Sequence, residues 1–161
     1  MFSFGGYFKD RFDPVLFRAA HMVGVLPPEG LPEIAQRALE RGFDGPSIRF
    51  IAALNGPTLR EISHTLSQFF DELGTVSTSQ KDAALTLSRA IAEDICEGRL
   101  DPYEGANVIW RRIYHKVGEP VELLPFVGLG SEYEDNPYLR TKLAADIVEA
   151  AKSFCAKVQN A

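Results

Sequence analysis

The stretch PTLREISHTLSQFFDELG, residues 57–74, carries the clearest structural pattern in the chain. Its large apolar side chains recur at intervals of three and four residues, at Leu59, Ile62, Leu66, Phe69 and Leu73. That spacing puts them on one face of an α-helix, because successive helical residues turn by about 100° around the axis. Gly74 follows the last of them, as glycine commonly does where a helix ends. The segment therefore predicts an amphipathic helix packed against a helical core.

The same helical period continues on both sides of this segment and is interrupted at glycines and prolines. Asp13 followed by Pro14 has the form of a helix N-cap with proline at the first helical position. Counted with the helix at 57–74, seven helices are predicted. The apolar faces of the other six are Val15, Leu16, Ala19, Ala20 and Val23; Leu31, Ile34, Ala35, Ala38 and Leu39; Ile48, Ile51 and Leu54; Ala84, Leu87, Ile91 and Ile95; Ala106, Ile109, Trp110, Ile113 and Val117; and Leu143, Ile147, Ala151, Phe154 and Val158.

Two serine-led capping boxes compete for the start of the helix that carries Ile91. One pairs Ser77 with Gln80, and the other pairs Ser79 with Asp82. No window of the sequence alternates apolar and polar residues as a half-buried strand does. A chain of this length forms one domain by default. We therefore predict an all-α fold, a single-domain bundle of about seven helices over residues 1–161.

Composition and charge narrow the classes of function. The 161 residues include 22 acidic and 17 basic ones, a formal charge of −5, whereas nucleic-acid binding needs positive charge against phosphates. No apolar run reaches the roughly 18 residues of a membrane span, and the N-terminus lacks a signal-peptide pattern. Cys96 and Cys155 lie among apolar neighbours, as structural free thiols do. We expect a cytoplasmic protein that binds neither nucleic acid nor membrane.

None of the common catalytic motifs is complete. The segment GLGSE, residues 128–132, has two of the glycines of a nucleotide-binding loop but no strand before it, and it does not match the G-x-S-x-G of a nucleophile elbow. His21, His64 and His115 are each more than forty residues apart, so no local pair is spaced to hold a metal ion. The sequence predicts no catalytic residue, no metal site and no cofactor.

The stretch LLPFVGLGSEYEDNP, residues 123–137, is the strongest candidate for a functional surface. We predict no long helix in residues 118–136, and a last helix that begins at Asn136 and Pro137. On one interpretation, the apolar half closes an end of the bundle while the carboxylates and Asn136 cap the last helix. On the other, a long connection with an acidic tip binds a partner protein. The two interpretations are compatible, and the partner-binding residues of the second are Ser131, Glu132, Tyr133, Glu134 and Asp135.

Two further segments carry a resemblance to a known group of proteins. IAEDICEGRLDPYEGANVIWRRI, residues 91–113, is followed by LLPFVGLGSEYED, residues 123–135. They resemble an uncharacterised family of small bacterial all-helical proteins with a P-E-G-A segment ahead of a P-F-x-G-L-x-S-E segment. The segment RALERGFDGPSIRFIAALN, residues 37–55, is also similar to that family, although Gly45 and Asn55 differ from the residues that are usual there. Some of its members resemble immunity proteins encoded beside secreted toxins.

The resemblance implies a non-enzymatic protein-binding module, with an immunity protein as one form of it. Such a protein neutralises a toxin by masking its surface, commonly with an acidic patch against a basic toxin domain. The alternative is an enzyme in which Glu132, Asp135 and His115 converge only in the fold, around a metal ion or as an acid and base pair. A third interpretation is homo-oligomerisation through the apolar loop or a helix face.

Overall fold

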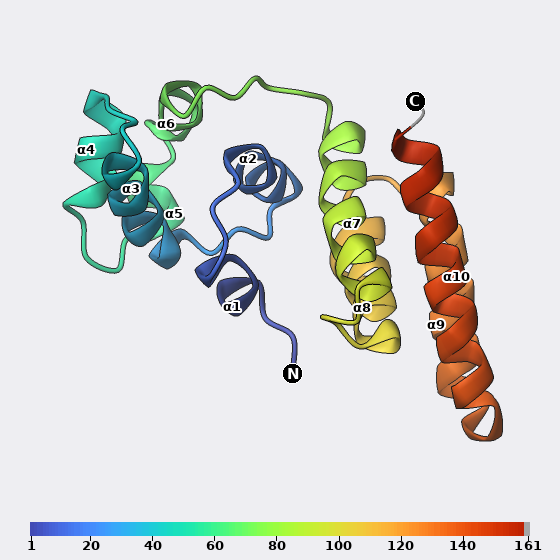
Figure 1. Ribbon diagram of the computed structural model, residues 1–161. Coiled ribbons are helices and arrows are strands. Elements are labelled where there is room, and N and C mark those ends of the chain that lie inside the picture. Colours follow the sequence, from blue (N-terminus) through green and yellow to red (C-terminus); the bar gives the residue numbers. More distant parts are fainter. Residues whose placement is uncertain (160–161) are drawn as a thin grey trace. The chain divides into compact units, whose positions relative to one another are not determined.

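The computed structural model describes residues 1–159, and the side chains up to residue 157. All regular structure in this part is helical, so the predicted all-α class is confirmed (Figure 1). Residues 1–159 form ten α-helices, whereas seven were predicted. The difference arises because one predicted helix is divided in two and two further helices were not predicted. The α-helices of residues 1–159 are α1 (Phe4–Lys9), α2 (Pro14–Val23), α3 (Leu31–Glu40), α4 (Pro46–Ala52), α5 (Leu59–Ile62), α6 (Leu66–Glu72), α7 (Gln80–Cys96), α8 (Pro102–Val108), α9 (Leu124–Asp135) and α10 (Arg140–Gln159).

The chain divides into two compact units. The N-terminal unit comprises residues 3–78, and the C-terminal unit comprises residues 1–2 together with 79–159. The single-domain assignment made from chain length stays a prediction. Short turns of 3-10 helix also connect the helices: η1 (Pro28–Gly30), η3 (Tyr114–Lys116), η4 (Val121–Leu123) and η5 (Pro137–Leu139). A π-helical turn, η2 (Ile109–Ile113), continues α8.

The N-terminal unit has an aromatic and aliphatic core in which α3, α4 and α6 pack together. Phe17, Ile48 and Phe69 are fully buried there. Arg18 of α2 is also buried, and its guanidinium donates hydrogen bonds to the Asp71 carboxylate at 2.9 Å and the Thr75 carbonyl at 3.0 Å. A buried charge needs such partners to offset the loss of hydration. Arg18 therefore joins α2 to the end of α6.

The start of α4 is capped by a side chain from a different helix. Gly45 occupies the N-cap position and has no side chain to offer. Instead, the Glu72 carboxylate of α6 accepts hydrogen bonds from the backbone N–H groups of Ser47 at 3.1 Å and Ile48 at 2.9 Å. These are among the N–H groups that a helix leaves without partners at its N-terminus. A Cβ on Gly45 would lie 2.7 Å from Glu72 Cγ and closer still to the carboxylate, so glycine makes room for the cap.

The helix predicted over residues 57–74 is interrupted, and the prediction of one continuous helix there is wrong. α5 ends at Ile62 and α6 begins at Leu66. In the gap, the Thr65 hydroxyl donates to Ser47 Oγ at 2.7 Å, which links the start of α6 to α4. Leu59 is 51% exposed and Val15 is 58% exposed, so neither belongs to the core.

The C-terminal unit is built around α7, α9 and α10, with α10 packed against the other two (Figure 1). Leu87, Ile91 and Phe126 are fully buried at its centre. Of the two predicted capping boxes, Ser79 with Asp82 is the correct one, because Ser79 Oγ accepts from the Asp82 N–H at 3.0 Å. Val158 was predicted to face inward, but its side chain lies outside the described residues.

α9 contradicts the prediction that residues 118–136 hold no long helix. Gly128 and Gly130 argue against a helix by propensity, since mid-helix glycine costs about 1 kcal/mol relative to alanine. Packing overrides that preference at Gly130, where a Cβ would lie 3.2 Å from the Trp110 ring. The last helix also begins later than predicted, at Arg140, with η5 before it. The additional short helix α1 is capped by Ser3, whose hydroxyl accepts from the Gly6 N–H at 3.1 Å.

Candidate functional site

The chain turns sharply where α9 gives way to α10, and this turn holds all five predicted partner-binding residues. We call residues 131–139, from the last turn of α9 through η5, the corner (Figure 1). Asn136 ends α9, because its backbone N–H and its side-chain amide both donate to the Glu132 carbonyl, at 2.9 and 3.0 Å. Asn136 makes no side-chain cap to the following turn, so the predicted N-capping role is wrong. Pro137 then cannot continue the hydrogen-bond pattern of α9.

Tyr133 fixes the corner to the rest of the C-terminal unit. Its ring meets Tyr103 of α8 edge to face, with 4.4 Å between ring centroids. The Arg140 guanidinium lies 5.1 Å from the Tyr133 ring centroid, and Arg140 Nε donates to the Tyr133 carbonyl at 3.3 Å. Tyr133 is half-buried by these contacts. It therefore positions the acidic residues around it more than it offers a free surface.

Glu134 is already paired within the chain. Its two carboxylate oxygens lie 3.1 and 3.0 Å from a guanidinium nitrogen of Arg111, which belongs to the π turn η2. The hydrogen bond with Arg111 lowers the pKa of Glu134 and raises that of Arg111. Arg111 also covers the Trp110 ring at 4.0 Å. A basic partner would have to compete with Arg111 for Glu134, so this carboxylate is the weakest candidate contact of the three.

Glu132 and Asp135 are the two exposed carboxylates of the corner without a salt bridge or side-chain hydrogen bond in residues 1–159. They were expected to favour the N-terminus of the last helix. They lie instead in the last turn of α9, where negative charge opposes the helix dipole. The first turn of α10 contains no acidic residue. After the hydrogen bond that Lys142 donates to Asp146, the charge of Glu132 also helps to raise the pKa of Lys142 in the first turn of α10. The placement of Glu132 and Asp135 is still unfavourable for α9 itself, and residues that break a local rule are candidates for function.

Two exposed apolar residues complete the corner, and sequence reasoning missed both. Tyr138 is 99% exposed and Leu139 is 47% exposed, and they follow Asp135 by three and four residues. Exposed tyrosine beside charged groups is typical of binding surfaces, where it supplies apolar area and a hydroxyl at once. The available signal was the order of residues in DNPYL, which puts an aromatic ring directly after a turn that follows an acidic run.

The enzyme alternative gains no geometric support from the histidine that it needs. His115 lies in η3, with Nδ1 3.5 Å from a carboxylate oxygen of Glu119. Between residues 1 and 159 no hydrogen bond or ion pair joins His115 to Glu132 or Asp135. His21 is stacked on Phe70 in the N-terminal unit, and burial lowers its pKa. No group of three His, Cys, Asp or Glu side chains among the described residues is placed to hold a metal ion.

The two cysteines are free thiols that lie within hydrogen-bonding reach of each other, between the end of α7 and α10. Burial, followed by the charge that the neighbouring Cys96 carries once it ionises, raises the pKa of Cys155 to about 11. Burial also raises the pKa of Cys96. Because the thiolate is the nucleophile, neither cysteine has the low pKa of a reactive catalytic thiol.

We expect iodoacetamide to alkylate Cys155 slowly in the native protein. At pH 8 a thiol with a pKa of about 11 has roughly a hundredfold less thiolate than one with the unperturbed value near 9, and the rate should rise about tenfold per pH unit up to pH 10. Mass spectrometry after timed quenching measures this, with urea-denatured protein as the fast control. Equal rates in native and denatured protein would contradict the burial of Cys155.

Comparison of the chain with protein-family models, curated proteins and solved structures found no match. The function of the corner is therefore inferred from its own geometry.

No helix in residues 1–159 is both long and apolar enough to span a bilayer.

Proposed function

We propose that this chain is a non-enzymatic protein-binding module whose contact surface is the corner, residues 131–139. The observation that carries the proposal is the pair of exposed, unpaired carboxylates Glu132 and Asp135 beside the exposed side chains of Tyr138 and Leu139. An apolar anchor flanked by charge is a common arrangement at protein interfaces. Tyr133 and Asn136 support it by fixing the backbone on which these residues stand.

The partner that fits this surface is a protein with a basic patch. Glu132 and Asp135 are three residues apart on a helix and so share one face, where they can meet two cations of a partner. Complementary charge speeds association and excludes partners of the wrong sign more than it adds affinity. Within this proposal, and following the resemblance, the partner is a toxin domain that the chain masks in the cytoplasm as an immunity protein.

The direct test uses the protein encoded by the gene next to that of this chain. We expect it to bind the purified chain in calorimetry, with affinity falling about tenfold or more between low and high salt. Replacing Glu132 and Asp135 by lysine should weaken binding by about a hundredfold, and Tyr138→Ala should weaken it by about tenfold. Circular dichroism checks that each variant keeps its helical content.

The matched control reverses two exposed carboxylates elsewhere that also have no salt bridge in the described part of the chain, Asp10→Lys with Glu40→Lys, which changes the net charge equally. We expect this control to bind within about threefold of the original chain. Equal losses from both double variants would mean that net charge, not the corner, governs binding. Unchanged binding after reversal at Glu132 and Asp135 would show that the corner is not the contact surface.

A further inference from the structure

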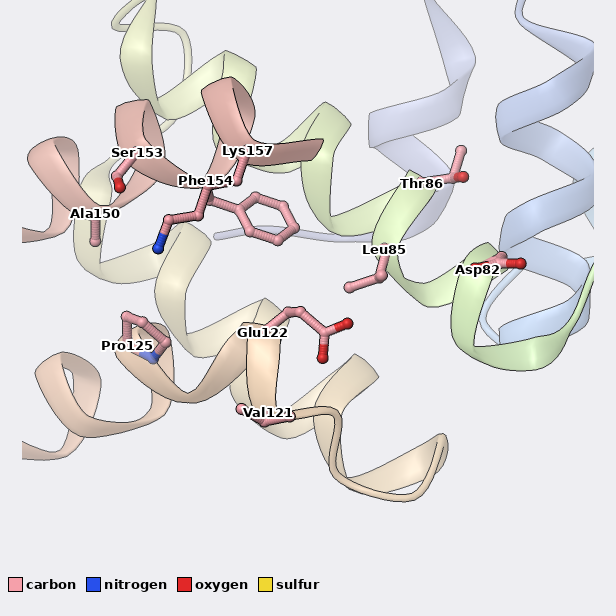
Figure 2. A pocket seen from close by; sticks show the side chains of 10 residues that line it. All are labelled: Asp82, Leu85, Thr86, Val121, Glu122, Pro125, Ala150, Ser153, Phe154 and Lys157. Carbon is pink, nitrogen blue, oxygen red and sulfur yellow. The ribbon is translucent and has the colours of Figure 1, made fainter. Parts of the chain in front are cut away.

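The C-terminal unit also contains a groove that none of the corner residues lines. It has a volume of about 980 Å³ and is bounded by α7, by η4 with the start of α9, and by α10 (Figure 2). Its apolar lining comes from Leu85, Val121, Pro125, Ala150 and Phe154. Ligand pockets commonly have volumes of roughly 300–1,000 Å³ and mostly apolar walls. The groove therefore has the size and surface of a small-molecule site.

The floor of this groove is held in place by packing in the core. Phe154 is only 6% exposed, and its ring meets the fully buried Phe126 edge to face with 5.7 Å between centroids. Pro125 and Ala150 have short side chains, which leave open the space beside that ring. Val121 at the rim is 67% exposed. Protein interiors are normally close-packed, but the apolar side chains on the two sides of this groove do not touch. Their exposed apolar surface is available for a ligand to cover.

Charge decides which kind of ligand the groove favours. In Figure 2 the Lys157 ammonium and the Glu122 carboxylate lie on opposite sides of the Phe154 ring. Glu122 is neutralised by Lys81, whose ammonium is 3.0 Å away. Asp82 lies in the first turn of α7, where the helix dipole favours a negative charge. Lys157 has no salt bridge in the described part of the chain, whereas Asp82 lies at the other end of the groove from the Lys157 ammonium (Figure 2), so the end of the groove beside Lys157 is positive.

We propose that this groove binds a fatty carboxylate, an aliphatic chain that ends in a carboxyl group. The carboxylate pairs with the Lys157 ammonium, and the chain lies over the Phe154 ring toward Leu85. Each methylene buried against these walls strengthens binding about fourfold, so the chain supplies most of the affinity. The ion pair at the rim supplies the preference for an anion over a neutral molecule of the same length.

The test compares decanoate, kept below its micelle concentration, with the neutral decanol, kept below its solubility limit, by isothermal titration calorimetry of the full chain. We expect decanoate to bind about fivefold more tightly than decanol. In Lys157→Met this preference should disappear while decanol binding stays the same. Lys152→Met is the matched control, because Lys152 stands on the same helix, pairs with Glu149 and does not line the groove. It should keep the preference.

A second variant tests the location without relying on charge. Ser153→Trp places a large ring at the exposed edge of the groove and should reduce decanoate binding by more than tenfold, with helical content unchanged. Amide shifts induced by decanoate should centre on Leu85, Ala150 and Phe154 of the unmodified chain. The proposal is overturned if decanol binds as tightly as decanoate, if Lys157→Met keeps the preference, or if the shifts fall elsewhere.

Discussion

Replacing Glu72 by alanine is expected to destabilise the N-terminal unit by about 3 kcal/mol. The substitution leaves the backbone N–H groups of Ser47 and Ile48 without acceptors, and each unsatisfied buried donor costs about 1–3 kcal/mol. It also removes a negative charge from the N-terminus of α4, where the helix dipole favours one. Because the only tryptophan of the chain lies in the other unit, unfolding in urea is best followed by circular dichroism.

Gly45→Ala tests the same cap from the opposite side. The new methyl group would displace the Glu72 side chain, so we expect it alone to cost about 2–3 kcal/mol. In a chain that already carries Glu72→Ala, the same change should cost less than about 1 kcal/mol, because the clashing side chain is gone. The backbone of Gly45 has φ of 162°, an extended conformation open to alanine.

The graded control is Glu72→Gln, which keeps one acceptor oxygen and the length of the side chain. It should cost about half as much as Glu72→Ala. Hydrogen exchange at the Ser47 and Ile48 amides adds a local readout, since both should exchange faster in Glu72→Ala. Additive costs for Gly45→Ala and Glu72→Ala would refute the assignment of Glu72 as the cap of α4.

Local signals explain which helices were predicted well from the sequence. The caps at Asp13 and Ser79 act within three residues along the chain, so the side chain and the N–H that it accepts from are both visible in the sequence. The Glu72 cap joins residues 24 and 25 positions apart. No residue close to Gly45 in the sequence indicates that a distant carboxylate caps this helix. Short-range caps were therefore predictable, and the long-range cap was not.

The acidic segment shows the same limit at the candidate site. Its five residues were predicted as one surface, and they do follow one another through the last turn of α9. The partner of Glu134 is Arg111, and the partner of Tyr133 is Tyr103, both more than twenty residues away in sequence. Through these interactions, Glu134 and Tyr133 hold the corner together. Glu132 and Asp135 have no such side-chain partner, so they are the candidate residues for contact with another protein. Only the fold makes this distinction.

The helix α9 ties the corner and the groove to the same core, through Phe126. We expect Phe126→Ala to destabilise the C-terminal unit by about 3–4 kcal/mol, since this ring is fully buried and its removal leaves a cavity against Phe154. Leu124→Ala is the control on the same helix, because Leu124 is 47% exposed, and it should cost less than about 1 kcal/mol. Both are measured by urea unfolding followed through Trp110 fluorescence.

Trp110 is a suitable probe because its ring lies against Gly130 of α9. If α9 is part of the packed core, Phe126→Ala should also lower the affinity of the groove for decanoate by about tenfold, since it loosens the Phe154 floor. Binding at the corner should be nearly unchanged where the variant is still folded, because Tyr133 and Asn136 hold that turn through other contacts. A cost for Phe126→Ala no larger than that of Leu124→Ala would mean that α9 is not anchored in the core, and both sites would then lose their common support.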